Sequence, residues 1–283
     1  MKTLLLFLPG VLLATFVFGN TTPDPIWHTK VGDVDFYSIQ DSAHEMSTGV
    51  LLTDDKDALA RLSPTGKTPS GIGVFVVKKG ADVALIDTGV GGQLTEHLKR
   101  IGIQSGDVKH ILLTHSHRDH VGGLVKDGEK FFPNATLWLD ARELAFWKTA
   151  RNKEFYEQCL KLYGEPKFLT PDEKTAVIVP ELVAVDLSGH TPGHTGFLLS
   201  SGDKKILMVG DLLHNGAVQF ARPDISIQFD NDPKAAADIR IRTLKRAADE
   251  NLLFAVCHLA MPAVGYVQVD GDGFKFTPVD PAK

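Results

Sequence analysis

The feature that most constrains this chain is a heptapeptide that crowds three imidazoles and a carboxylate into one turn. T-H-S-H-R-D-H (residues 114–120) directly follows an apolar run at residues 111–113. Clustered histidines contribute little apolar burial and repel each other when protonated, unless another cation lies between them. With 11 histidines in 283 residues, this spacing arises by chance in roughly one such chain in a thousand. The motif therefore predicts a metal site at the end of a strand.

Spacing divides the motif into two ligand groups. Residues two apart on an extended segment point to the same side, so His115 and His117 can hold one ion. Asp119 and His120 follow at a turn and face a neighbouring position. Imidazole nitrogens and carboxylate oxygens suit zinc and similar divalent metals. Other predicted strands also end in candidate ligands, namely His190 and His194 (G-H-T-P-G-H, residues 189–194), Asp211 and His258. Four strand ends would deliver these side chains to one rim of an α/β fold.

Hydrophobic periodicity predicts alternating strands and helices in two similar halves of an α/β fold. We expect strands at 71–78, 83–87, 108–113, 135–139, 197–200, 206–209 and 252–257, and short strands within 175–186. We expect helices at 94–101, 140–163 and 232–251, and a hairpin around 270–273. Asp140 is predicted to cap the second helix with Glu143 as its partner, and Asp232 to cap the third. Residues 45–70 contain few such signals and predict a loop that forms a lid or a pocket wall.

The first 19 residues resemble a secretory signal peptide. A positive start at Lys2 precedes an apolar stretch that is short for a membrane span, and the sequence turns polar at Asn20. A membrane anchor or a buried first helix are the alternatives. We therefore expect a cleaved signal at 1–19, a single domain at 20–283 without a stable membrane span, and a secreted or periplasmic location.

Composition and net charge limit the classes of molecule that this protein is expected to bind. The net charge is -5 and no basic block is present, which disfavours nucleic acid. We expect a small-molecule substrate, and the sequence leaves a homodimer open. The only cysteines are Cys159 and Cys257. They could pair in an oxidising compartment, but Cys257 lies in an apolar run and fits a buried free thiol better.

These motifs together resemble the metallo-β-lactamase superfamily of binuclear metallohydrolases. H-x-H-x-D-H, G-H-T-P-G-H, Gly-Asp at 210–211, the late His258 and D-T-G at 87–89 all match its pattern. The resemblance implies a four-layered αβ/βα sandwich with the metal site at one rim. The stretches at 210–220 and 258–265 look most like the branch that contains methyl parathion hydrolase and related lactonases.

The resemblance also assigns the ligands. It implies that His115, His117 and His190 hold one metal, that Asp119, His120 and His258 hold the other, and that Asp211 bridges both. His194 would then orient a ligand. The family suggests Zn²⁺, although these ligands would also accept Mn²⁺, Co²⁺ or Fe²⁺. Two such ions would share a hydroxide that attacks a carbonyl or phosphorus, with Asp119 or Asp211 orienting it.

Particular residues favour some reactions of the superfamily over others. The true β-lactamases of the superfamily lack the bridging Asp211, and a glyoxalase-II-like thioesterase is expected to have a more basic tail than Lys275 and Lys283 provide. We therefore predict hydrolysis of a lactone or ester, or of a phosphotriester. That thioesterase activity and persulfide-dioxygenase-like redox chemistry remain alternatives, as does a non-catalytic metal-binding protein. The related lactonases use a Tyr that is missing near Asp211, so His214 is a candidate donor or acid, or else orients a ligand.

The substrate pocket is predicted from three side chains. Trp147 looks similar to a pocket aromatic of the methyl parathion hydrolase branch, with a core position as the alternative. Phe155 lies farther along the same predicted helix and could join it. Met261 stands where the branch pattern H-L-x-F-P has an aromatic, which predicts a reshaped pocket and poor organophosphate hydrolysis.

Overall fold

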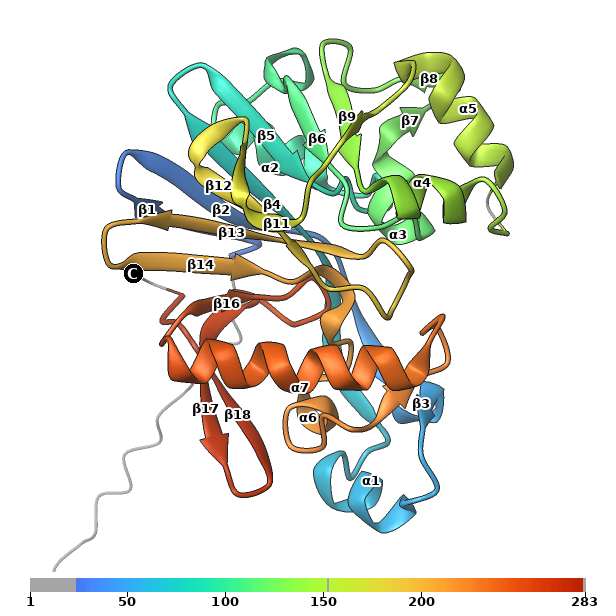
Figure 1. The fold of residues 1–283 in the computed structure, drawn as a ribbon, viewed down its shortest axis with the longest axis vertical. Coiled ribbons are helices and arrows are strands. Elements are labelled where there is room, and N and C mark those ends of the chain that lie inside the picture. The colour runs from blue at the N-terminus through green and yellow to red at the C-terminus, as the bar shows by residue number, and fades with distance from the viewer. Residues whose placement is uncertain (1–23, 152, 282–283) are drawn as a thin grey trace, which may run out of the picture.

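Two mixed β-sheets face each other, and helices cover the outer face of each sheet (Figure 1). The computed structural model describes residues 24–151 and 153–281, so the predicted signal peptide lies outside the described residues. Among the described helices, none is both long and apolar enough to cross a membrane. The predicted four-layered αβ/βα sandwich with two similar halves is confirmed.

The first sheet has the order β1-β2-β4-β5-β6-β9-β10. β5, β6, β9 and β10 run parallel to one another, and the remaining neighbours are antiparallel. Its strands are β1 (Ile26–Val31), β2 (Val34–Ser47), β4 (Lys67–Lys79), β5 (Asp82–Ile86), β6 (His110–Leu112), β9 (Thr136–Leu139) and β10 (Lys167–Phe168).

The second sheet has the order β11-β12-β13-β14-β16-β17-β18, and only β14 and β16 are parallel neighbours. Its strands are β11 (Asp172–Val177), β12 (Val179–Asp186), β13 (Thr195–Ser201), β14 (Lys204–Met208), β16 (Leu253–Ala255), β17 (Val264–Asp270) and β18 (Gly273–Pro278). Two small ribbons pair β3 (Leu51–Leu52) with β15 (Ser226–Ile227), and β7 (Val125–Lys126) with β8 (Glu129–Lys130).

The α-helices are α1 (Lys56–Leu62), α2 (Leu94–Arg100), α3 (Arg118–Val121), α4 (Ala141–Trp147), α5 (Lys153–Tyr163), α6 (Gly216–Gln219) and α7 (Pro233–Asp249). Short 3-10 turns are η1 (Thr48–Val50), η2 (Ser105–Asp107), η3 (Gly122–Leu124) and η4 (Gly210–Leu212). The prediction of one helix over 140–163 is wrong, because the segment forms two helices, α4 and α5. Asp232 caps α7 through the backbone N–H of Ala235, as predicted.

β4 is apolar on both sides because its successive side chains point to opposite faces of the sheet and both faces are buried. Phe75 and Val77 point into the core between the two sheets, whereas Val74 and Val76 point into the core beneath α2, α4 and α5. A strand with both faces buried reads as a continuous apolar run instead of an alternating one. On the other side of the molecule, α7 packs on the second sheet through Leu244.

Residues 45–70 contain more regular structure than their sequence predicts. β2 and β4 extend beyond the first sheet as a long antiparallel pair that ends at the segment holding α1 (Figure 1). Asp55 caps α1 by accepting a hydrogen bond from Ala58 N. The mistaken loop prediction follows from polar residues on this exposed extension. The pocket-wall prediction is confirmed, since Met46 and Val50 line the large cavity described below.

Both cysteines are buried free thiols. Cys159 points from α5 into the core between that helix and the first sheet, and Cys257 lies between the two sheets. The two side chains therefore belong to different layers, and the option of a disulfide is wrong.

Candidate metal centre

Four segments that follow strands meet at one rim of the sandwich. They are the loop and α3 after β6, the β12–β13 turn, η4 after β14, and the loop after β16. One donor atom from each of His115, His117, His190 and Asp211 lies within 4.8 Å of the others. Asp119, His120 and His258 form a second group with the same limit. The structure thus brings together all seven predicted ligands.

Asp211 lies between the two groups. Its Oδ1 is 2.9 Å from His120 Nε2 and 3.1 Å from His258 Nε2. Its Oδ2 is 3.2 Å from His190 Nε2 and 3.4 Å from His115 Nε2. Each oxygen of one carboxylate therefore faces a different histidine group, which is the arrangement that a bridging ligand requires.

The donor set fits divalent metals on an observation independent of its sequence pattern. His115 Nε2, His120 Nε2, His258 Nε2 and Asp211 Oδ1 are buried, and none has a hydrogen-bond partner among the described residues. Unpaired buried polar atoms are costly, and native proteins pair nearly all of them. These four atoms lie close together, but their geometry does not fit hydrogen bonds between them. Metal ligands are arranged in this way, because their lone pairs point at a shared cation.

The opposite nitrogen of these three imidazoles, and the Nδ1 of His190, whose Nε2 lies 3.0 Å from His117 Nδ1, are fixed by the protein. His115 Nδ1 lies 3.0 Å from Thr114 Oγ1, His120 Nδ1 2.7 Å from Asp87 Oδ2, His190 Nδ1 2.8 Å from Asp230 Oδ1, and His258 Nδ1 2.9 Å from Gly71 O. Such contacts orient a ring and set the tautomer that leaves Nε2 free for a metal. Asp87 belongs to the D-T-G motif, which explains what that motif does here.

The electrostatics indicate a site that attracts positive charge. Burial opposes protonation of His190, but the carboxylates of Asp211 and Asp230 outweigh it and raise the pKa of His190 to about 9. Burial raises the pKa of Asp211, yet the surrounding imidazoles, foremost His120, hold it well below its ordinary value. Burial lowers the pKa of His117 to about 4. A carboxylate surrounded by imidazoles can thus hold protons or metal ions.

His194 orients a ligand, as predicted from its place in the motif. Asp211 N–H donates to His194 Nε2 at 3.1 Å, so His194 Nδ1 carries the proton and donates to Leu187 O at 3.0 Å. Burial lowers the pKa of His194 to about 3, which keeps the ring neutral. Gly210 has a φ of 49°, and a Cβ there would lie 2.6 Å from His194 Nε2, so the glycine beside Asp211 is required.

Sequence reasoning missed the role of Glu143. Instead of completing a capping box with Asp140, which caps α4 through Arg142 N, Glu143 is fully buried behind the ligand loops. Its Oε1 accepts from the backbone N–H and hydroxyl of Ser116 at 2.8 and 2.7 Å. Its Oε2 accepts from Thr191 Oγ1 at 2.6 Å and Gly193 N at 3.1 Å. One carboxylate therefore ties the loop of His115 and His117 to the loop of His190.

We expect Glu143→Gln to destabilise the fold and loosen the metal centre. The amide NH₂ cannot accept the hydrogen bonds now made to one carboxylate oxygen, and each buried group left unpaired costs about 1–3 kcal/mol. The expected result is a loss of about 2–4 kcal/mol in urea unfolding, with weaker metal retention during dialysis. Glu154→Gln, on the exposed start of α5, is the control and should change neither property. Wild-type stability in Glu143→Gln would show that the hydrogen bonds of Glu143 to the two ligand loops are unimportant.

Asp230 is the other contact that sequence reasoning missed. It is buried, and its two oxygens contact His190 Nδ1 at 2.8 Å and Ile227 N at 3.0 Å. It stands two residues before the helix cap Asp232. No local pattern distinguishes one aspartate from the other, because only the folded chain places Asp230 behind His190.

A cavity of about 900 Å³ opens over the metal centre. His117, Asp119, Asp211, His214 and His258 form its floor. Asp119 faces this space with 36% of its side chain exposed. The larger apolar side chains of the wall are Met46, Val50, Ile72, Phe146 and Phe229.

The three predicted pocket residues do not line this cavity. Trp147 is buried in the core against Tyr156, with 5.4 Å between ring centroids, and Phe146 reaches the cavity instead. Neighbouring positions on a helix point about 100° apart, so the prediction missed the correct face by one residue. Phe155 packs on the same core, and Met261 packs between two apolar clusters. The pocket prediction is therefore wrong for all three.

Comparison with known proteins places this geometry in a family. The family model of the metallo-beta-lactamase superfamily matches residues 68–258, a segment that contains all seven candidate ligands. The chain belongs to the metallo-beta-lactamase superfamily. Membership supports a metal-dependent hydrolase and divalent metal ions at the rim.

Relatives in the superfamily include proteins with similar folds over nearly the whole chain. The crystal structure of AbOPH, a hydrolase of the beta lactamase superfamily, has a TM-score of 0.82 at 26% identity, covering 93% of this chain and 99% of AbOPH. AidC, a dizinc quorum-quenching lactonase, has a TM-score of 0.81 at 24% identity, covering 90% and 97%. A probable metallo-hydrolase of Mycobacterium bovis, Mb2322c, is 26% identical over 57% of this chain, which spans only 58% of that relative.

Proposed function

We propose that this protein is a binuclear metal-dependent hydrolase that cleaves lactones or related carboxylic esters. The observation that carries the proposal is the Asp211 carboxylate, whose two oxygens face two groups of buried imidazoles beneath an open cavity. Two bound divalent ions, which we expect to be zinc, would supply an activated water and polarise the substrate carbonyl. The likeness to AbOPH and to the lactonase AidC supports this choice.

The residues around the centre fit ester hydrolysis. Asp119 is a partly exposed ligand, and its Oδ2 lies 3.6 Å from His258 Nε2 and 3.9 Å from His120 Nε2. We assign Asp119 the role of accepting a proton from the attacking water, since its carboxylate reaches the cavity floor. The apolar wall would hold the acyl part of a substrate against this floor and exclude bulk water.

The experiment that tests the proposal is a substrate panel on metal-loaded protein. It compares acyl-homoserine lactones, simple lactones, aryl esters and phosphotriesters, and follows oxygen uptake in parallel. We expect the highest kcat/KM on a lactone or aryl ester, with weaker turnover of phosphotriesters. Oxygen consumption by an iron-containing protein, or inactivity of fully metallated protein on every class, would contradict the proposal.

His214 is expected to support the centre by holding Asp211. Its Nε2 lies 3.0 Å from Asp211 Oδ2, and its ring stacks on His258 at 5.1 Å with an interplanar angle of 14°. It also lines the cavity, and its Nδ1 has no partner among the described residues. The contact with Asp211 favours an orienting role, while the exposed face of the cavity leaves room for a contact with substrate.

We expect His214→Phe to lower kcat by about 10- to 100-fold, the usual effect of losing a side chain that orients a metal ligand. Metal content separates the two roles. An orienting His214 predicts weaker metal retention together with the lower kcat, whereas a donor to substrate predicts a lower kcat with full metal content. His28→Phe, on the exposed edge strand β1, is the control. An unchanged kcat in His214→Phe would exclude both roles.

A further inference from the structure

Two arginines line the cavity above the metal centre and carry unneutralised charge. Arg118 and Arg151 are both exposed, and both contribute to its wall. Across residues 24–151 and 153–281, neither guanidinium lies within 4.0 Å of a carboxylate oxygen. By contrast, Arg142 and Arg222 each bind two carboxylates. The cavity thus has two cationic groups available to a ligand.

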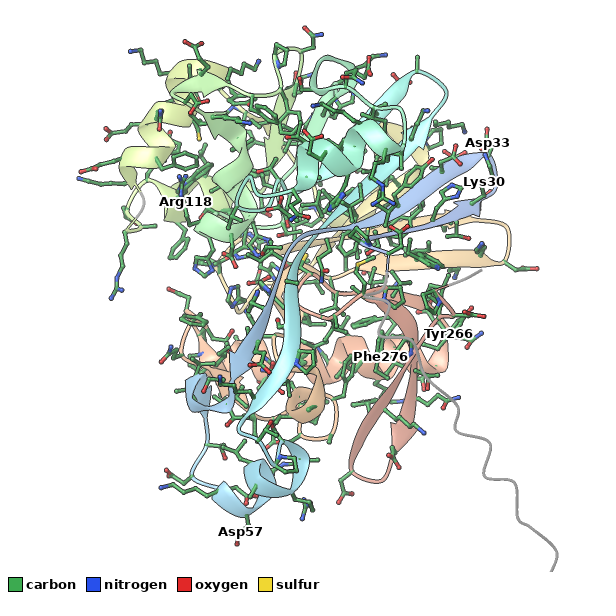
Figure 2. The ribbon with its side chains drawn as sticks, turned by 180° about the vertical axis from the view of Figure 1, so that it is seen from behind. Lys30, Asp33, Asp57, Arg118, Tyr266 and Phe276 are labelled. Atoms are coloured by element: carbon green, nitrogen blue, oxygen red, sulfur yellow. The ribbon has the colours of Figure 1, made fainter. Side chains whose placement is uncertain are left out.

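Arg118 is held in place by an aromatic ring. Its guanidinium carbon lies 3.6 Å from the centroid of the Phe155 ring, and Figure 2 shows Arg118 beside the segment that contains α4 and α5. Stacking on an aromatic face fixes the plane of a guanidinium and leaves its N–H edge free to donate. A preorganised guanidinium loses less entropy when it binds an oxyanion than a freely rotating one. Phe155 therefore acts on the cavity through Arg118 without lining it.

The other charges of the cavity do not cancel these arginines. Glu45 contributes to the wall, but its carboxylate lies 3.5 Å from Lys67 Nζ. Asp119 and Asp211 belong to the metal ligand groups, and bound divalent ions would compensate their charge. The metal-loaded cavity therefore combines cationic groups with the apolar wall of Met46, Val50, Ile72, Phe146 and Phe229.

We propose that the preferred substrate is an ester or lactone that carries a carboxylate remote from the scissile bond, and that Arg118 and Arg151 bind this carboxylate. The inference rests on the proposed hydrolase function and defines its substrate class. The scissile carbonyl would lie on the metal floor, the apolar part of the acyl chain would contact the wall, and the distal carboxylate would accept hydrogen bonds from the two guanidinium groups.

The test compares matched substrates on metal-loaded protein. Nitrophenyl monoesters of short, medium and long linear dicarboxylic acids are paired with the same esters whose distal acid is a primary amide. For the best chain length, we expect kcat/KM to be about 10- to 100-fold higher for the acid, the range of one or two charge-assisted hydrogen bonds. In the double variant Arg118→Gln/Arg151→Gln, this ratio should fall to near unity.

Three further variants separate the effect of charge from an effect on folding. Lys148→Gln removes one positive charge just after α4 without altering the cavity wall, and should keep the wild-type ratio. Phe155→Leu should lower the ratio part of the way, through a higher KM for the acid. Arg151→Gln alone, outside the ligand motif, should also lower it. A wild-type ratio of one or less, or an unchanged ratio in the double variant, overturns the proposal.

A binding measurement distinguishes failure of this inference from failure of the hydrolase function. Calorimetric titration of metal-loaded protein compares a linear dicarboxylate with the monocarboxylate of equal length. Tighter binding of the dicarboxylate, lost in the double variant, supports the arginine site even if no ester is hydrolysed. Equal binding of both acids overturns it, even if neutral esters are hydrolysed well.

Discussion

Replacing Asp211 with Asn is expected to lower kcat/KM by about 10²–10³-fold or more, the range for losing a dominant electrostatic group of an active site. The amide keeps the shape of the side chain, but it loses the negative charge and presents an NH₂ to one of the two histidine groups. His120 Nε2 lies 2.9 Å from Oδ1 and His190 Nε2 lies 3.2 Å from Oδ2, so either orientation removes one acceptor. Only a carboxylate can serve both ions.

The control for this variant is Asp203→Asn, in the exposed turn between β13 and β14. It should retain wild-type activity. Far-ultraviolet circular dichroism should show that Asp211→Asn keeps the fold, because the two sheets and their cores do not depend on this side chain. Activity of Asp211→Asn within a few-fold of wild type would contradict a mechanism that depends on two metals.

Removing the metals is expected to have the second-largest effect. A ligand that binds only the folded state stabilises it by about 4 kcal/mol when present at a thousand times its Kd. Chelation should therefore abolish hydrolysis and lower the melting temperature by roughly 10 °C for a domain of this size. In the metal-free protein, His190 has a pKa raised to about 9 by Asp211 and Asp230, so protons should be taken up as metal leaves.

The measurement combines calorimetry with activity, before and after dialysis against a chelator. Adding a divalent ion back should restore both the melting temperature and hydrolysis. A wild-type melting temperature in metal-free protein, or full activity after chelation, would contradict the assignment of the rim as a metal centre.

The metal ligands could be predicted from sequence because each of them lies in a segment that follows a predicted strand. His115, His117, Asp119 and His120 are nearly consecutive, so their spacing alone indicates a site. His258 and Asp211 each follow an apolar strand, and strand ends at one rim of an α/β fold lie close together. Spacing separated the pair His115 and His117 from Asp119 and His120. The family resemblance assigned His190, His258 and Asp211 to the two ions, and the distances to Asp211 agree with this division.

The supporting residues could not be predicted, because their roles depend on burial and on contacts distant in sequence. Glu143 has the spacing of a capping partner, yet it turns inward to loops 27 and 48 residues away. Gly193 shows why: a Cβ there would collide with the Glu143 backbone, so a glycine lets α4 approach the ligand loop. Nothing within a few residues of either position indicates this contact.

The prediction of the pocket residues was wrong for a geometric reason. Phe146 and Trp147 are neighbours on α4, and hydrophobicity alone does not distinguish which of the two side chains faces the cavity. Arg151 lies between the end of α4 and the start of α5, and it contributes to the cavity wall. The predicted continuous helix would have set the direction of its side chain differently, by the helical repeat of about 100° per residue. One of the two arginines in the proposed carboxylate site therefore lies in a stretch whose secondary structure was wrongly predicted.

The most direct test of the binuclear centre is the metal stoichiometry of the wild-type protein and three variants, all purified without chelator. Elemental analysis should find two divalent ions per wild-type chain. His117→Ala and Asp119→Ala should each lose about one ion, because the two residues belong to different ligand groups. The double variant should lose both. A wild-type protein that binds a single ion at saturation, or a loss of both ions in each single variant, would contradict two separable sites joined by Asp211.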